Sequence, residues 1–525
     1  METALPRQRP PREEEAGKPG TFLSHQVVGG IPWTVISKAV LFFAYFSISI
    51  LLVRNLGAEN YGVFSLCKNI SEYLVVVCAL GLNTAVVRFV PELLVSRNRA
   101  GLTRLLTKTA VLQMGMAVFI GLGLGAMKSY LDAWFHIEFS PLLLLFIALM
   151  VAAQLARDFI VDALTAVFQV RALSVLSIVH GLLWASLLAT VLPLAPQVHV
   201  ALSAQIASLS LLFAVGLVFL VSFLRRLDWR SPLLGIGRRR TLWISFSSLG
   251  NGLVNMLMKK YTEVFFLGVF STPAVVGLYD LGYSVPLMVV TFLPLAIQKL
   301  FTSGFAEAYT RDEACLGRLV AFLHKTLILT MVPLAAFGVC FAPRAIALFY
   351  GTQMQEAGTI AAAFFVLHSL NLLYVPLSMA IIAKEKILQT LPVTLLQFAV
   401  KLVLDYLLIP AGGIYGAIAA VALSFFLTLP VQLWVVYRLV GGIYFPLGFL
   451  AKVTLPLGAL AALLSRLSPQ LNIPGLLGLG VAYLGACLLL IRLLRLIRRE
   501  DVAELRELGL ERLNKALDFL VGGGS

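Results

Sequence analysis

Apolar stretches long enough to cross a membrane follow one another along almost the whole chain, and few folds can accommodate them. A membrane-spanning helix needs about 20 apolar residues. The sequence is 59% hydrophobic and only 13% charged, whereas a soluble protein has about 25% charged residues. We therefore expect an all-α polytopic membrane protein with fourteen spans. They cover roughly residues 32–54, 60–90, 104–127, 141–167, 172–193, 198–224, 241–269, 274–301, 317–342, 357–381, 387–409, 413–438, 446–465 and 473–496.

Basic residues are concentrated in every second link between these spans. The link at 225–240 is rich in arginine, whereas the links after spans 5, 7 and 11 carry almost no charge. Lysine and arginine accumulate on the cytoplasmic side of membrane proteins, so both termini are predicted to be cytoplasmic and the protein to lie in the inner (plasma) membrane. The formal net charge of +15 is explained in this way, and we expect no nucleic-acid partner.

The chain contains an internal repeat. The pattern at residues 54–93 returns in the middle of the sequence, where Gly277-Leu278-Tyr279 matches Gly62-Val63-Phe64 and Glu307 matches Glu92. Repeated halves with charges inside the membrane are typical of transporters.

The repeat and the link composition together predict the domain organisation. We expect a disordered cytoplasmic tail at 1–30, an N-terminal lobe at 31–224, a basic linker at 225–240, a C-terminal lobe at 241–440, two extra spans at 441–498 and a cytoplasmic amphipathic helix at 499–521.

Charged and polar side chains interrupt the predicted spans. A charge at the bilayer centre costs at least about 2.5–3.5 kcal/mol, so such residues are expected to face a polar interior. The cations predicted to line a substrate cavity are Lys68, Arg88, Arg157, Lys259 and Lys260. The carboxylates predicted to line it or to couple transport to an ion are Glu72, Asp158, Glu263, Asp280 and Asp405. The further polar residues of the cavity are Asn251, Asn255 and Lys401.

Some of these residues have specific spacings. Lys68 and Glu72 are four residues apart and can pair on one helix face, which leaves open that they only hold helices together. Asn251, Asn255, Lys259 and Glu263 continue at the same interval and predict a polar stripe along a cavity wall, with a helix–helix seam as the alternative. His180, near Trp184, is a weaker signal, because a lone histidine in a span is more often a core residue than a proton relay.

The sequence contains no enzyme signature. The links on the outer side are too short for a catalytic domain, and there is no phosphate-binding glycine-rich loop. The five cysteines are scattered without metal-binding or disulfide spacing. We expect neither enzymatic activity nor a cofactor or metal ion.

Three segments give the chain a resemblance to a known family: residues 56–64, residues 88–92 (Arg-Phe-Val-Pro-Glu) and residues 409–419. In this order, with spans grouped as six, six and two, the sequence resembles the polysaccharide-transporter (Wzx-type flippase) branch of the multidrug/oligosaccharidyl-lipid/polysaccharide (MOP) exporter superfamily. The resemblance implies a V-shaped pair of lobes and alternating access. It also implies transfer of a polyprenyl-pyrophosphate-linked oligosaccharide to the outer leaflet for surface polysaccharide synthesis, with membrane lipids and glycan polymerase or glycosyltransferase machinery as partners.

One position departs from the pattern. In related lipid II flippases, a carboxylate on span 7 and an Asn and an Asp on span 11 bind sodium. Here Glu263 and Asp405 match the carboxylates, but Lys401 stands at the Asn position. An ammonium there would neutralise both acids, so we predict no sodium site. Two alternatives remain: a multidrug or organic-cation antiporter of the same fold, and a non-transporting scaffold of a glycan-assembly complex.

Overall fold

The structure is a computed structural model that describes residues 21–167, 169–225, 237–311, 313–441, 446–467, 472–494 and 496. Its elements are helices. They are α1 (Thr21–Ala79), α2 (Leu82–Val95), α3 (Arg99–Ala126), α4 (Lys128–Phe135), α5 (Pro141–Ala166), α6 (Val170–Val191), α7 (Val198–Arg225), α8 (Arg238–Leu257), α9 (Tyr261–Phe270), α10 (Pro273–Arg311), α11 (Glu313–Tyr350), η2 (Thr352–Met354), α12 (Gln355–Leu372), α13 (Val375–Ala383), η3 (Ile387–Thr390), α14 (Leu391–Val440), α15 (Leu447–Ser465) and α16 (Ile473–Leu493).

The helices correspond to the predicted spans. In the described part of the chain, eleven helical segments are long and apolar enough to cross a membrane. Two of them, α1 and α14, each contain two helices that meet at a non-helical glycine, Gly57 in α1 and Gly413 in α14. The predicted seventh span is divided between α8 and α9. Every predicted span thus has a helical counterpart, while the number of membrane crossings, fourteen, stays a prediction.

The predicted terminal segments lie largely outside the described residues. The tail predicted at 1–30 is described only from Thr21, where α1 already begins, so the helix starts earlier than the sequence suggested. The amphipathic helix predicted at 499–521 lies wholly outside the described residues.

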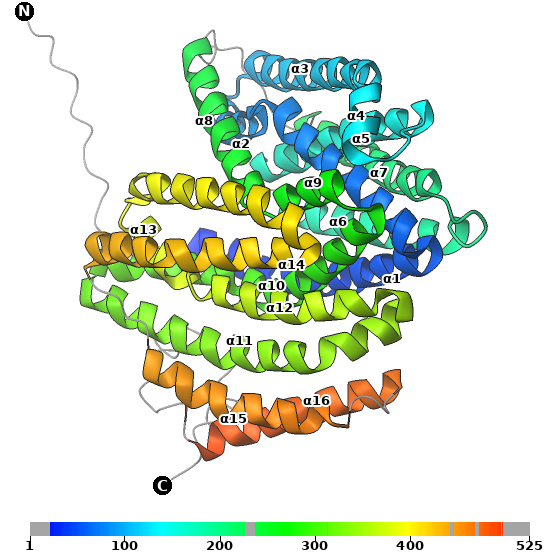
Figure 1. The fold of residues 1–525 in the computed structure, drawn as a ribbon. Helices are drawn as coiled ribbons and strands as arrows, with labels where there is room; N and C mark the ends of the chain where they lie inside the picture. Colours follow the sequence, from blue (N-terminus) through cyan, green and yellow to red (C-terminus); the bar gives the residue numbers. More distant parts are fainter. Residues whose placement is uncertain are drawn as a thin grey trace, which may run out of the picture.

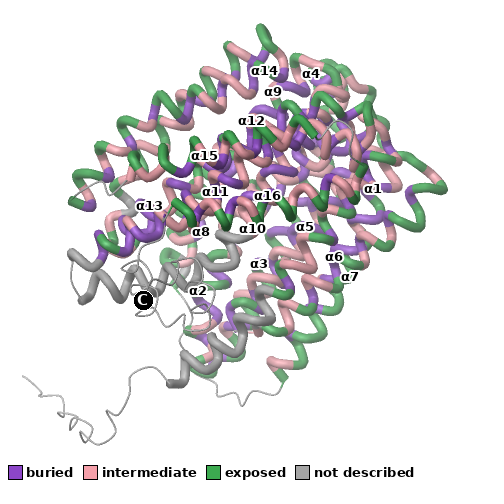
Figure 2. The backbone as a smooth tube through the Cα atoms, turned by 90° about the horizontal axis from the view of Figure 1, so that it is seen from below, coloured by how far each residue is buried: buried purple, intermediate pink, exposed green. Residues whose placement is uncertain are grey.

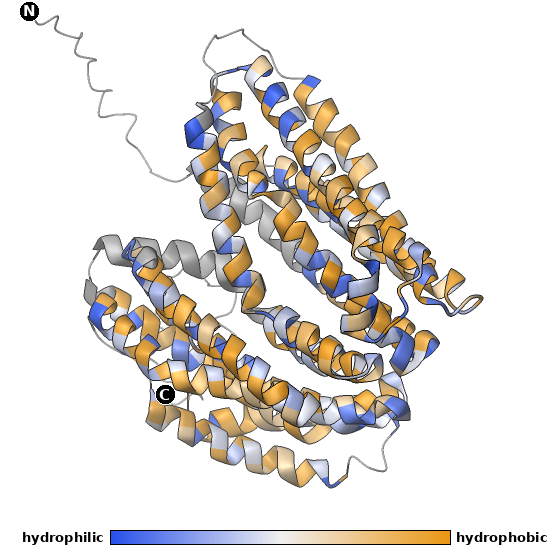
Figure 3. Cartoon of the chain, turned by 45° about the horizontal axis from the view of Figure 1, so that its top comes forward, coloured by the Kyte–Doolittle hydropathy of each residue, from blue (hydrophilic) through white to orange (hydrophobic). Residues whose placement is uncertain are grey.

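The helices form two groups that diverge on one side of the molecule (Figures 1 and 3). Helices α3, α5, α6 and α7 pack with α1, and α2 packs with α3 and α5. Helices α10 to α14 pack with one another, and α15 and α16 pack on α11. Helix α8 comes from the second half of the sequence, but it packs on α2 and α1 of the first group. We call the two groups the N-lobe and the C-lobe.

A continuous apolar core joins the lobes at the end opposite to the divergence. Its buried side chains come from α1 and α3 to α7 of the N-lobe and from α9 to α12, η2 and α14 of the C-lobe. Figure 2 shows buried positions along the inner helices. Large apolar side chains on the outer faces are exposed, among them Phe119, Phe246 and Leu455. Exposed apolar surface on this scale marks contact with lipid or protein.

The lobes touch most closely where α1 crosses α10. A Cβ atom on Gly62 would lie 1.7 Å from the carbonyl oxygen of Pro273, and a Cβ on Gly277 would lie 2.8 Å from that of Ala58. These two glycines are the residues that the sequence repeat equates, so the halves meet at equivalent points. Nearby, Arg54 of α1 donates hydrogen bonds of 2.7 Å to the carbonyl oxygens of Leu348 and Phe349 at the C-terminal end of α11.

Substitution of Gly62 by alanine should separate the lobes at this crossing. The new methyl group meets backbone atoms that cannot move independently, and overpacking typically costs about 1–3 kcal/mol. We expect a lower melting temperature for the purified variant in a thermal unfolding assay. The matched control is Gly123→Ala in α3, whose Cβ would meet nothing within 4 Å and which should melt like the wild type or slightly higher. Equal melting of Gly62→Ala and wild type would contradict the close crossing.

Candidate functional site

A cavity of about 710 Å³ lies between the two lobes. Its walls come from both parts of α1, from α5, α6 and α7 of the N-lobe, and from α8, α9 and α10. Among the residues that the structure describes, the charged side chains that line it are Lys68, Glu72, Arg157, Asp158, Lys259 and Asp280. All six are among the residues predicted from the sequence to line a cavity.

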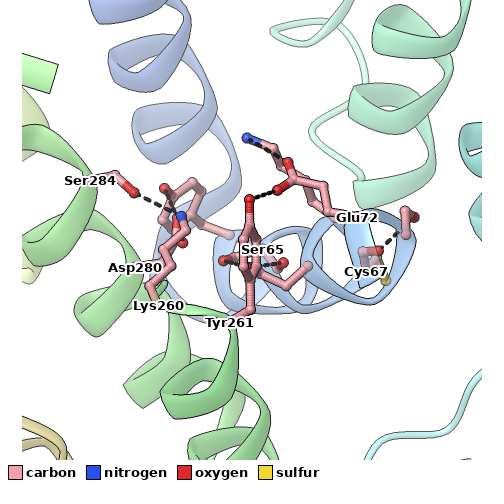
Figure 4. A network of polar contacts seen from close by, with 11 residues as sticks. Ser65, Cys67, Glu72, Lys260, Tyr261, Asp280 and Ser284 are labelled. Atoms are coloured by element: carbon pink, nitrogen blue, oxygen red, sulfur yellow. Dashed lines mark hydrogen bonds and ion pairs between the residues drawn. The ribbon is translucent and has the colours of Figure 1, made fainter. Parts of the chain in front are cut away.

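A polar network on one wall connects α1 with α9 and α10 (Figure 4). Lys260 Nζ donates to Asp280 Oδ1 and, at 2.8 Å, to Ser284 Oγ. Tyr61 Oη of α1 donates to the second oxygen of Asp280 at 2.9 Å. Tyr261 Oη donates to Glu72 Oε2. The two lobes are therefore connected by side-chain hydrogen bonds next to the cavity.

The interruption between α8 and α9 positions the two adjacent lysines. The hydroxyl group of Thr262 donates to the carbonyl oxygen of Leu257 at 2.8 Å, which satisfies one acceptor at the end of α8. Lys260 then turns toward α10 and contacts Asp280, whereas Lys259 is exposed in the cavity. In the described part of the chain, no carboxylate forms an ion pair with Lys259.

The other cavity cations have carboxylate neighbours. Arg157 Nη2 lies 2.7 Å from Asp158 Oδ1. Lys68 Nζ lies 3.9 Å from Glu72 Oε1, so the pair predicted from the four-residue spacing is present but loose. Among the described cations of the cavity lining, Lys259 is thus the one without a carboxylate within ion-pair distance.

The polar stripe predicted along residues 251–263 is not continuous. Asn255 and Lys259 line the cavity, but Asn251 is outside its lining and accepts hydrogen bonds from Asn255 Nδ2. Because the helix is interrupted between Leu257 and Tyr261, the regular interval ends there, and Glu263 is buried in the C-lobe. Glu263, at one end of the predicted stripe, therefore lies at a contact between two helices, which is the alternative of a helix–helix seam.

Glu263, Lys401 and Asp405 form a buried cluster in the C-lobe. Lys401 Nζ lies 2.9 Å from Glu263 Oε2 and 3.1 Å from Asp405 Oδ2, and the side chains are at most 3% exposed. The ammonium group thus occupies the space between the two acids, as expected from the substitution at position 401. The absence of a sodium site stays a prediction.

Arg88 lies outside the cavity lining. It is on α2 and lies 3.6 Å from Glu92, which also pairs at 3.0 Å with Arg240 at the start of α8. This position gives no support to its expected role in substrate binding, which stays a prediction.

Sequence reasoning missed the tyrosines of the site. Tyr61 and Tyr261 provide the hydroxyl groups of the network, and Ser284 accepts from Lys260. Tyr61 follows the turn at 56–60, and Tyr261 follows the two lysines, so both lie beside residues that were singled out. A tyrosine in the sequence does not by itself indicate a hydrogen-bond donor in a cavity, because tyrosines are also common at membrane surfaces.

Comparison with known proteins gives the family. The model of a family described as "polysaccharide biosynthesis protein" matches residues 51–359. This chain belongs to that family. The matched region contains both parts of the repeat and most of the cavity lining, including Lys68, Arg157 and Lys259. No curated protein matches the chain in sequence.

Solved structures confirm the fold. The lipid II flippase MurJ in an inward closed conformation is similar with a TM-score of 0.68 at 11% identity, over 88% of this chain and 97% of that one. An inward-facing multidrug-resistance MATE transporter of the MOP superfamily gives 0.59 at 14% identity, over 77% and 98%. A MOP superfamily transporter from Pyrococcus furiosus gives 0.53 at 14% identity, over 79% and 96%. The chain therefore has the fold of MOP transporters and is a multi-pass membrane protein.

Replacement of Lys401 by methionine should destabilise the C-lobe. It leaves two acids in a buried place without their counter-charge, and loss of one partner of a buried ion pair costs about 3–5 kcal/mol. We expect a large decrease in melting temperature that Lys401→Met/Asp405→Asn partly reverses. Lys452→Met, at an exposed position of α15, is the matched control. If Lys401→Met melts like this control, the cluster does not stabilise the lobe.

Proposed function

We propose that this protein is a flippase that moves a lipid-linked oligosaccharide, joined to a polyprenyl phosphate or pyrophosphate, from the cytoplasmic to the outer leaflet. On this proposal it serves cell-surface polysaccharide synthesis and does not change its substrate covalently. The family model and the likeness to MurJ, a lipid II flippase, support the substrate class.

The observation that carries the proposal is the ammonium group of Lys259 in the cavity between the lobes. It has no ion-pair partner among the described residues, and its charge is therefore available to a ligand. Lys68 is only loosely paired with Glu72, because its Nζ lies 3.9 Å from Glu72 Oε1 and the two side chains are 34% and 28% exposed. It can therefore turn toward a nearby anion. A phosphate group among these cations would be attracted strongly, because a cavity with low-dielectric walls concentrates the field.

The pairing of the cavity carboxylates argues against an organic-cation exporter. Each carboxylate of the cavity already contacts a cation: Glu72 contacts Lys68, Asp158 contacts Arg157, and Asp280 contacts Lys260. In the described part of the cavity, the unpaired charge is thus positive rather than negative. A binding site for cationic drugs would need the opposite arrangement.

Alternating access fits the way the lobes are joined. Three features lie near links that the charge distribution predicts to be outside: the crossing of α1 and α10 at Gly62 and Gly277, the interruption of α1 at Gly57, and the end of α11. On this assignment the lobes are closed at the outer side and diverge toward the cytoplasm. We propose that the sugar-lipid enters from the inner leaflet of the plasma membrane, with both termini cytoplasmic and glycan polymerase or glycosyltransferase enzymes as neighbours.

Complementation with cavity variants tests this function. In cells that lack their own copy of the protein, we expect Lys259→Ala to reduce surface glycan about tenfold or more, because loss of one charge-assisted contact is worth about 1.5–3 kcal/mol. Lys68→Ala should have a smaller effect, and Lys259→Arg should restore export.

Lys452→Ala is the control for this assay, because Lys452 is exposed on α15, outside the cavity lining. Membrane protein levels must be equal in all strains. Normal export by Lys259→Ala/Lys68→Ala would overturn the flippase proposal and favour the scaffold.

A further inference from the structure

Buried polar atoms without partners gather on the N-lobe wall of the cavity. Within the part of the chain that the structure describes, His180 Nε2, Trp184 Nε1, Gln205 Oε1 and Arg157 Nε have no hydrogen-bond partner. All four residues line the cavity. A buried polar group without a partner costs about 1–3 kcal/mol, so four on one wall of a cavity indicate a place that a ligand completes.

The local folding explains why these side chains share one wall. His180 and Trp184 are four residues apart on α6 and therefore face the same way. Gln205 comes from α7 and Arg157 from α5, which pack side by side with α6. His180, Trp184 and Gln205 are each 6% exposed, whereas the side chain of Arg157 is 38% exposed. Three of the four residues are therefore held within packed helices at the edge of the cavity, and Arg157 is open to it.

The chemistry of this wall differs from that of Lys68 and Lys259, the lysines that line the cavity. Trp184 offers an N–H donor, Gln205 an acceptor and a donor, and His180 one of each according to its tautomer. The charge of Arg157 is offset by Asp158 at 2.7 Å. A phosphate group can only accept hydrogen bonds, whereas sugar hydroxyl groups both donate and accept, so neutral hydroxyls match this set better.

Aromatic rings complete the wall. The ring centroid of Tyr45 of α1 lies 6.2 Å from that of Trp184, and the ring centroid of His180 lies at the same distance from Trp184. Pockets for small polar ligands combine aromatic surface with a few well-placed polar groups. A sugar ring has both apolar C–H faces and hydroxyl edges, which suits such a wall.

We propose that His180, Trp184, Gln205 and Arg157 form a carbohydrate subsite that binds a neutral sugar of the glycan headgroup. This inference deepens the proposed function and rests on it. The subsite divides the cavity by chemistry: the phosphate is bound near Lys259, and the sugar is selected at the N-lobe wall. Substitutions here should therefore change which glycan is accepted.

The test uses the purified full-length protein and two separate probes. Neutral hexoses, N-acetylhexosamines and deoxyhexoses are screened by saturation-transfer NMR, and farnesyl pyrophosphate is titrated by thermal shift. We expect at least one neutral sugar to bind, and Gln205→Leu and Trp184→Phe to weaken it about tenfold, as for the loss of one hydrogen bond. Both variants should bind farnesyl pyrophosphate as the wild type does.

A stability measurement separates a binding role from a structural one. Since Gln205 Oε1 has no partner in the described structure, Gln205→Leu should not lower the melting temperature. The matched control is Gln432→Leu: Gln432 is buried in α14, bonds to Gln397 at 2.9 Å and lies outside the cavity lining. This control should lose stability and keep sugar binding.

The outcomes distinguish the two proposals. If no neutral sugar binds the wild type, or if both subsite variants bind it unchanged, the subsite is wrong and water alone fills the wall. If sugars bind as expected but farnesyl pyrophosphate does not bind and Lys259→Ala exports normally, the flippase proposal fails while the subsite stands.

Discussion

The crossing of α1 and α10 at Gly62 and Gly277 is the constraint on which the arrangement depends. With no side chain at either position, the two backbones approach closely enough that Tyr61 of one helix reaches Asp280 of the other. The hydrogen bonds beside the cavity follow from this distance. Because the two glycines are equivalent in the repeat, the lobes meet symmetrically at one end, and their remaining helices are left to diverge around the cavity.

The charged residues then have two different physical roles. In the C-lobe, Lys401 is enclosed by Glu263 and Asp405, and burial of all three makes this cluster a structural element with no free charge. In the cavity, solvent exposure lowers the cost of a charge, and Lys259 stays without an acidic partner among the described residues. The distinction between a paired buried cation and an unpaired accessible one decides which lysine can attract a phosphate.

Much of this could be predicted from sequence, because it depends on local spacing. The apolar spans, the interruption at Gly57 and the pairs formed within one helix, such as Lys68 with Glu72, follow from helical periodicity and turn chemistry. The interruption between α8 and α9 contains neither glycine nor proline, so the sequence predicted that the stripe would continue to Glu263. Contacts between distant helices, such as Tyr261 with Glu72, depend on how the lobes pack and leave no local signal.

Transport of a sugar-lipid in proteoliposomes tests the central claim most directly. Purified protein is reconstituted with a polyprenyl-pyrophosphate-linked sugar, and a membrane-impermeant glycosidase reports how much of the sugar changes leaflet. The account predicts protein-dependent transfer that Lys259→Ala slows about tenfold or more and Lys452→Ala leaves intact. Transfer no faster than in protein-free vesicles, or equal transfer by both variants, would contradict it.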